Sequence, residues 1–191
     1  ASDRLLELDS SSDQIDSLTS VVEEQFKAMT KAAAELTSIR TRAAEELAKQ
    51  VTAELAALAM PGSTLVVSVS ESPEFGATGK DLVSIQLSSY PGAEPRPLGK
   101  GASGGELSRI MLAIEVVLAQ TEQAPTFIFD EVDAGVGGAA AIEVGRRLAM
   151  LAKQAQVIVV THLAQVAAFA NQHLRVLKNS TDEFTEIGRA H

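Results

Sequence analysis

The chain has 191 residues, of which 46% are hydrophobic and 21% charged, as in ordinary soluble globular proteins. It has no cysteine, which excludes disulfides and thiolate metal sites, and no apolar run approaches the roughly 18 residues of a membrane span. A net charge of -9 and only 4% aromatic residues argue against broad nucleic-acid binding or base stacking by this segment. The missing initial Met and the abrupt end at His191 suggest a fragment of a longer protein.

Residues 1 to about 60 predict one long helix, because they contain no Gly and the first Pro is Pro61. Ser10 to Asp13 can cap a helix start. Apolar residues then recur at spacings of three, four or seven, at Ile15, Leu18, Val22, Met29, Leu36 and Ala43. This narrow seam is typical of one helix of a coiled coil whose partner lies outside the chain. A single amphipathic helix packed on the next domain explains the same pattern, and the pattern alone favours that alternative.

Two β-strands are predicted after Pro61 and Gly62, which end the helix. They cover residues 64–69 and 82–87 with a glycine-containing turn between them, so we expect an antiparallel pair. Neither 76–80 nor 99–101 fits the phosphate-binding Walker A loop, which needs four residues between its glycines and a Ser or Thr after the Lys. The chain therefore contains no Walker A motif.

A glycine-rich segment precedes an amphipathic helix that starts near Leu107. Ser103 and Glu106 have the spacing of a capping box, which would explain the helix start without any ligand. Gly104 and Gly105 are poor helix formers, and they favour a start that a ligand approaches closely. A serine hydroxyl, free backbone N–H groups and the helix dipole can together bind an anion, so we predict phosphate binding here.

The stretch from Phe127 to Asp133 is the centre of the predicted site. Phe127 to Phe129 predicts a strand buried on both faces of a parallel sheet, with acidic residues at its carboxyl end, where ligands bind. Asp130 could hold a hard cation, directly or through water. Glu131, pointing the other way along an extended backbone, could act as a base on water. An acidic turn at the end of a buried strand is an equally good interpretation of this stretch alone.

A helix over 139–153 and a second fully buried strand over 156–161 are expected next. They place His162 at the same sheet edge as Asp130 and Glu131. A single His after a strand is more often structural, yet here its imidazole could reach a terminal phosphate or orient water. A short helix over 163–170 and a strand over 173–178, with 184–187 as its candidate partner, complete the chain. Alternating strands and helices predict an α/β fold with a mostly parallel sheet flanked by helices.

Four motifs in register resemble those of ABC-type ATPases. Residues 103–106 are similar to the signature motif, 127–131 to the Walker B strand with its catalytic Glu, 132–135 to the D-loop, and 161–162 to the switch histidine. Within this superfamily, residues 64–178 are most similar to the RecN family of bacterial SMC-like DNA repair ATPases. The resemblance implies that residues 1–60 are the returning helix of a coiled-coil arm and that 61–191 are the C-terminal half of the ATPase head.

The resemblance also implies that ATP and Mg²⁺ are the cofactors and that two heads sandwich two ATP molecules in a homodimer. Glu131 would polarise the attacking water and His162 would contact the γ-phosphate side, which makes these two residues the catalytic ones. Asp130 would support Mg²⁺, and Asp133 would couple the two sites across the dimer. The implied nucleotide-binding positions are Ser103, Gly104, Gly105, Glu106, Asp130 and Asp133, with the signature residues acting on the nucleotide of the second head.

The implied function is ATP-driven head dimerisation on DNA during double-strand-break repair and recombination, in the cytoplasm at the nucleoid and without a membrane partner. Walker A would come from the N-terminal half of the same head, so we expect no ATP hydrolysis by the isolated chain. Two alternatives stay open, another SMC-, Rad50- or RecF-like repair ATPase and a non-enzymatic coiled-coil scaffold with a degenerate head. The presence of both Glu131 and His162 argues against the scaffold.

Overall fold

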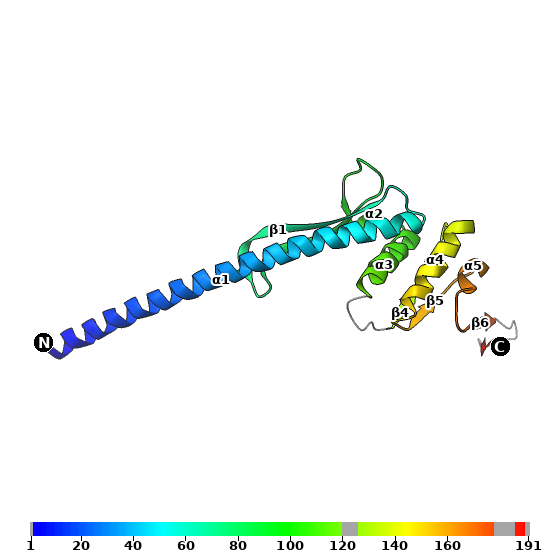
Figure 1. The fold of residues 1–191 in the computed structure, drawn as a ribbon. Helices are drawn as coiled ribbons and strands as arrows, with labels where there is room; N and C mark the ends of the chain where they lie inside the picture. Colours follow the sequence, from blue (N-terminus) through cyan, green and yellow to red (C-terminus); the bar gives the residue numbers. More distant parts are fainter. Residues whose placement is uncertain (1, 120–125, 178–185, 190–191) are drawn as a thin grey trace. The chain divides into compact units, whose positions relative to one another are not determined.

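The computed structural model describes residues 2–119, 126–177 and 186–189 and divides the chain into two compact units. One unit contains residues 1–44 and 68–83, and the other contains 45–67 and 84–191. Helix α1 (Ser2–Ala57) and strands β1 (Thr64–Gly76) and β2 (Gly79–Ser88) contribute to both units (Figure 1). The helix ends shortly before Pro61, as predicted, and the proposed division into an arm over 1–60 and a head over 61–191 stays a prediction.

In the first unit, the turn of the β1–β2 hairpin is fixed to α1 by polar contacts. The carboxylate of Asp81 accepts hydrogen bonds from Thr37 Oγ1 at 2.7 Å and from Arg40 Nη1 at 2.9 Å. Arg40 also donates through Nη2 to the carbonyl oxygen of Thr78 at 2.8 Å. The hydrogen bond from Thr37, followed by the hydrogen bond and charge of Arg40 and the charge of Lys80, lowers the pKa of Asp81.

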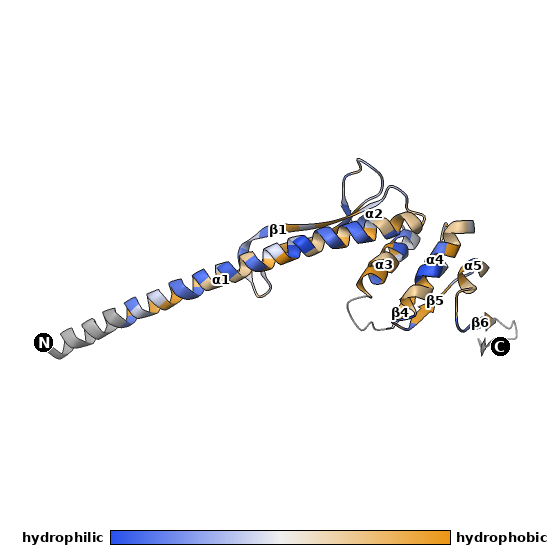
Figure 2. Cartoon of the chain, viewed as in Figure 1, coloured by the Kyte–Doolittle hydropathy of each residue, from blue (hydrophilic) through white to orange (hydrophobic). Residues whose placement is uncertain are grey.

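The apolar seam predicted along α1 is mostly exposed in its N-terminal part. Ile15, Leu18 and Val22 lie in solvent, and Figure 2 shows hydrophobic and hydrophilic residues alternating along this helix. Further along, the rings of Phe26 and Phe75 meet edge to face with their centroids 6.0 Å apart. An exposed seam agrees with a coiled-coil partner outside the described residues, and that partner stays a prediction.

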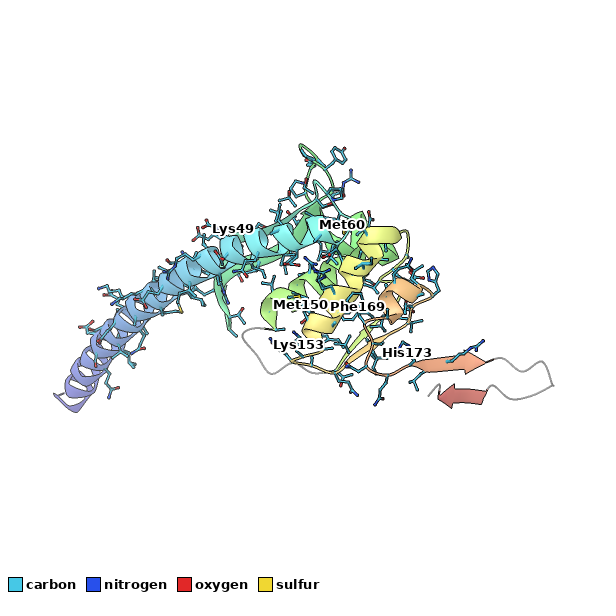
Figure 3. The ribbon with its side chains drawn as sticks, turned by 45° about the vertical axis from the view of Figure 1, so that its right-hand side comes forward. Lys49, Met60, Met150, Lys153, Phe169 and His173 are labelled. Carbon is cyan, nitrogen blue, oxygen red and sulfur yellow. The ribbon has the colours of Figure 1, made fainter. Side chains whose placement is uncertain are left out.

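The core of the second unit joins the C-terminal end of α1 to two helices, α3 (Gly104–Leu118) and α4 (Gly138–Leu151). Its largest fully buried side chains are Val51, Leu55, Leu58, Leu65, Ile110, Leu112, Val132, Val144 and Leu151. Arg147 of α4 pairs through Nε with Glu54 of α1 at 3.0 Å and also bonds to Glu143. Phe169 packs against α4 (Figure 3). Its ring lies so close to Gly145 that a Cβ added to Gly145 would be 2.4 Å from the Phe169 ring.

The strands form three small groups. Strand β2 lies between β1 and β3 (Arg96–Pro97), which the short helix α2 (Leu98–Gly101) follows. The two-residue turn between β1 and β2 makes that pair antiparallel, as predicted. Strand β4 (Phe127–Phe129) pairs in parallel with β5 (Val157–Val159), and β6 (Leu174–Leu177) pairs antiparallel with β7 (Glu186–Arg189) after helix α5 (Ala164–Ala167). Within the described residues, parallel pairing is thus confined to β4 and β5.

The prediction that β4 and β5 are buried on both faces is wrong for this chain. Phe129 lies in the core, whereas Ile128 is 70% exposed and Ile158 is 44% exposed. Successive strand residues point to opposite faces, so one face of this pair packs on the core and nothing in the described structure covers the other. The residues of both strands are nonetheless all hydrophobic (Figure 2).

Two further predictions concern the chain's later elements. The candidate strand at 184–187 is observed as β7 and pairs with β6, although Phe184 itself and Lys178 lie outside the described residues, as does Pro125. No helix in the described part of the chain combines the length and the apolar character that crossing a membrane requires.

Candidate functional site

The start of α3 carries the predicted capping box. Ser103 is the N-cap, and its Oγ accepts from the backbone N–H of Glu106 at 3.4 Å. In return, Glu106 Oε2 accepts from the backbone N–H of Ser103 and from Ser103 Oγ, both at 2.8 Å. These bonds, the backbone one first, lower the pKa of Glu106. Ser103 and Gly104 are exposed, and the first N–H groups of a helix have no partner within it, so anion binding at this helix start stays a prediction.

The acidic turn follows β4 directly and is exposed at Asp130 and Glu131. Asp130 Oδ1 accepts from the backbone N–H of Glu131 at 2.9 Å, and the carbonyl oxygen of Glu131 accepts from the N–H of Ala134 at 2.9 Å. The φ angle of Glu131 is 56°, so the predicted extended backbone is wrong at this residue. The tight turn imposes this left-handed conformation, which costs a non-glycine residue about 1–3 kcal/mol and is typical of functional sites.

The two glycines of α3 make room for this turn. A Cβ on Gly104 would lie 2.6 Å from Glu131 Oε2, so the carboxylate sits directly at the helix start. A Cβ on Gly105 would lie 2.8 Å from the Cβ of Ala134 and 3.1 Å from two backbone carbonyl oxygens, those of Ala134 and Glu131. The glycines therefore have a packing role within this chain, in addition to the ligand approach that the sequence predicts.

Asp133 connects the acidic turn to the end of β5. Its side chain is 3% exposed, and Oδ2 accepts from Thr161 Oγ1 at 2.5 Å and from the backbone N–H of His162 at 3.3 Å. The same oxygen lies 3.4 Å from His162 Nδ1, while the His162 side chain is 76% exposed. The structure thus brings the predicted D-loop and switch-histidine residues together within one chain.

The sequence of the chain is similar to those of known DNA repair proteins. No protein-family model matches it. It is 52% identical over 168 residues to the DNA repair protein RecN of Streptomyces coelicolor, and the match covers 82% of this chain. It is also 44% identical over 207 residues to the DNA repair protein RecN of Mycobacterium leprae, which covers 98% of this chain. The chain is a RecN-type sequence.

The segment corresponds to the C-terminal part of RecN proteins, and it spans 29% and 35% of the length of these two relatives. The fold agrees with the Smc head domain with a coiled coil and joint from Pyrococcus yayanosii, at a TM-score of 0.68 and 23% identity over 98% of this chain and 34% of that one. A structure from a study of ATP-driven dimerization and DNA stimulated activation of SMC ATPases matches at 0.51 and 22%, over 81% of this chain and 89% of that one. These likenesses confirm the α/β fold of a C-terminal SMC-type head lobe.

Two polar residues next to the acidic turn were not singled out from the sequence. Ser108 donates through Oγ to the carbonyl oxygen of Asp130 at 2.7 Å. Arg109, which is only 5% exposed, donates through Nη1 to the carbonyl oxygens of Ala134 at 2.8 Å and Val132 at 3.5 Å. Burial lowers the pKa of Arg109. A charged residue in register with buried Leu112, Ala113 and Val116 was the signal available in the sequence.

The donor set fits a Mg²⁺ ion held mainly by nucleotide and water. Asp130 offers an exposed carboxylate at the end of β4, and no three His, Asp or Glu side chains gather as a metal site anywhere in the described residues. Magnesium in phosphoryl-transfer sites commonly uses one or two carboxylates, with phosphate and water oxygens completing its shell. One carboxylate at this edge is therefore a suitable protein contribution.

Proposed function

We propose that this chain is the C-terminal half of the ATP-binding and ATP-hydrolysing head of a RecN-type DNA repair protein. The observation that carries the proposal is that Glu131 lies against the start of α3, while Asp133 ties the same turn to His162. An acid, a glycine-opened helix start and an imidazole therefore belong to one connected edge. The names of the relatives support DNA repair, and the SMC ATPase likeness supports nucleotide hydrolysis as the driving reaction.

Glu131 is the proposed catalytic base. Its carboxylate is exposed and close to the α3 start, so it can orient and polarise a water molecule that attacks the γ-phosphate of ATP. Asp130 would hold Mg²⁺, directly or through water, which neutralises charge on the phosphates. The exposed ring of His162 is available to the terminal phosphate, and buried Asp133 fixes the backbone that carries it.

The N-terminal half of the same head is the proposed partner for the uncovered face of β4 and β5. This face presents Ile128 and Ile158, and beside it a groove between α3 and β4 is lined by Leu107, Ser108, Met111, Glu115, Phe127, Ile128 and Phe129. The relatives are long enough to supply such a segment, because this chain spans only about a third of them. That segment would also supply the Walker A loop absent here.

A second head is the proposed partner for the start of α3. Ser103, Gly104 and Gly105, supported by Glu106, would contact the γ-phosphate of the ATP bound to that head, so that ATP closes a homodimer. Asp133, next to this surface, would couple the two sites. Opening and closing of the dimer would move the coiled-coil arms on DNA during double-strand-break repair and recombination, in the cytoplasm at the nucleoid.

The proposal is tested by ATP turnover with and without the missing segment. The purified chain alone should release no phosphate from ATP, because nothing in it cradles the β- and γ-phosphates. ATP turnover that requires Mg²⁺ should appear when the missing N-terminal segment is present, as it is in the full-length RecN-type protein that contains this sequence. Turnover by the chain alone, or none by the full-length protein, would contradict the proposal, and the second result would favour a non-enzymatic scaffold.

A further inference from the structure

In the acidic turn, the backbone carbonyl oxygens of every second residue from 130 to 134 accept hydrogen bonds from two neighbouring side chains of α3. The oxygen of Asp130 accepts from Ser108, and those of Val132 and Ala134 accept from the Nη1 atom of Arg109. Carbonyls 130, 132 and 134 bracket Glu131 on both sides. We call Ser108, Arg109 and these three carbonyl groups the carbonyl clamp.

The carbonyl clamp holds a backbone that is not relaxed by itself. Glu131 has a φ angle of 56°, which non-glycine residues rarely keep unless the surrounding structure imposes it. The Ala134-to-Glu131 backbone hydrogen bond closes the turn, but it leaves carbonyls 130, 132 and 134 to other donors. Arg109 is buried, and its Nε has no hydrogen-bond partner among the described residues. Burial of this charged group costs desolvation free energy, which the hydrogen bonds of Nη1 to the carbonyl oxygens of Val132 and Ala134 offset.

The α3 start and the acidic turn also fit without spare volume. A Cβ on Gly104 would meet the Glu131 carboxylate, and one on Gly105 would meet the backbone of the turn. Displacement of the α3 start must therefore displace the turn, because tightly packed surfaces transmit small shifts rather than absorb them. The hydrogen bonds of Asp133 to Thr161 and His162 extend the connection to the end of β5.

We infer that Ser108 and Arg109 are positioning residues for Glu131. Through the carbonyl clamp, helix α3, which begins with the signature motif, and the acidic turn, which contains Glu131, move as a single body within one head. The inference rests on the proposed ATPase function. Under it, contact of a second head's nucleotide with the start of α3 is felt at the Glu131 of this same head. Ser108 and Arg109 act through the backbone of the turn and do not contact the reacting atoms.

The test uses a full-length RecN-type protein carrying this sequence. Arg109→Met removes the donor to carbonyls 132 and 134, Arg109→Lys keeps the charge with a shorter side chain, and Ser108→Ala removes the donor to carbonyl 130. Misplacement of a catalytic group by about 1 Å costs on the order of a hundredfold in rate. We expect kcat for ATP to fall about tenfold to a hundredfold in Arg109→Met, with KM within about twofold and ATP-dependent head dimerisation retained. Arg109→Lys and Ser108→Ala should fall between this variant and the unmodified protein.

Arg147→Met is the matched control, because Arg147 is a partly buried arginine of α4 that pairs with the carboxylates of Glu54 and Glu143 rather than with the carbonyl groups of the turn. Its turnover per folded molecule should stay within about twofold of the unmodified protein. Amide hydrogen exchange over residues 130–135 supplies a readout independent of activity. It should accelerate in Arg109→Met and Ser108→Ala and remain unchanged in Arg147→Met.

The outcomes separate this inference from the proposed function. Unchanged exchange over 130–135, or unchanged kcat, in folded Arg109→Met and Ser108→Ala would overturn the positioning role even if the protein hydrolyses ATP. Absence of turnover in the unmodified protein would instead overturn the proposed function, and faster exchange in the two variants would still establish the carbonyl clamp. If Arg109→Met does not fold, Ser108→Ala carries the same comparison.

Discussion

Replacing Gly105 by alanine tests the tight contact between α3 and the acidic turn. The new Cβ would lie 2.8 Å from the Cβ of Ala134 and 3.1 Å from the carbonyl oxygens of Ala134 and Glu131. Two of these three atoms belong to the backbone, so the clash cannot be relieved by turning a side chain. Relief requires the turn to separate from the helix start, which also moves Glu131.

The magnitude follows from two opposing effects. Overpacking of a well-packed contact costs about 1–3 kcal/mol. Alanine is favoured over glycine in a helix by up to about 1 kcal/mol, partly through the unfolded chain. Gly99 of α2 is the matched control, because a Cβ there has no neighbour within 4 Å. Gly99→Ala should therefore be neutral or slightly stabilising, and the difference between the two variants should isolate the packing cost of about 1–3 kcal/mol.

Thermal unfolding of the chain followed by circular dichroism measures this difference. At this chain length 1 kcal/mol corresponds to about 2–4 °C, so Gly105→Ala should unfold at a temperature about 2–12 °C below that of Gly99→Ala. In the full-length protein, Gly105→Ala should also lower ATP turnover. Equal unfolding temperatures for the two variants would refute the close approach of the turn to α3.

Three further predictions concern the core, the hairpin and the helix start. Leu55→Ala, at a fully buried position, should lower the free energy of unfolding by about 2–5 kcal/mol in urea titrations. Ile15→Ala, on the exposed seam, should change the free energy of unfolding by less than about 0.5 kcal/mol. Equal effects of the two substitutions would contradict the assigned core. The pKa of Asp81 is lowered in the folded chain, so the stability that its carboxylate contributes is complete above the ordinary pKa of 3.8 and is lost as pH falls through the folded pKa. Asp81→Asn should therefore flatten the pH dependence of the free energy of unfolding in that acid range. An unchanged pH profile would argue against the Thr37 and Arg40 contacts. Ser103→Arg in the full-length protein should block ATP-dependent dimerisation in light scattering while ATP binding persists, and lost binding would contradict a role on the second head's nucleotide.

Local chemistry in the sequence was sufficient to predict most elements of the fold. Pro61 and Gly62 limit α1, and the glycine turn sets the β1–β2 hairpin. The spacing of Ser103 and Glu106 predicted a capping box that the structure confirms. In each case the deciding interaction joins residues close in sequence, so a short stretch contains the information it needs.

Features that depend on distant residues were not predictable in this way. The apolar run at β4 indicates a preference for burial, but it cannot say whether the covering segment belongs to this chain, and Ile128 is in fact uncovered. The left-handed backbone of Glu131 arises from the turn and from donors on α3. Arg109 was not singled out in the sequence, because its partners, the carbonyl oxygens of Val132 and Ala134, lie far along the chain. The roles of the site residues toward ATP and a second head stay predictions.

Glu131→Gln in the full-length protein tests the central claim most directly. The amide keeps the size of the side chain but cannot accept a proton from water. We expect ATP hydrolysis to fall by about a hundredfold or more, while ATP-bound head dimers accumulate and are resolved by size-exclusion chromatography with light scattering. Hydrolysis at the unmodified rate, with no accumulation of dimers, would contradict the assignment of Glu131 as the base of an ATPase head.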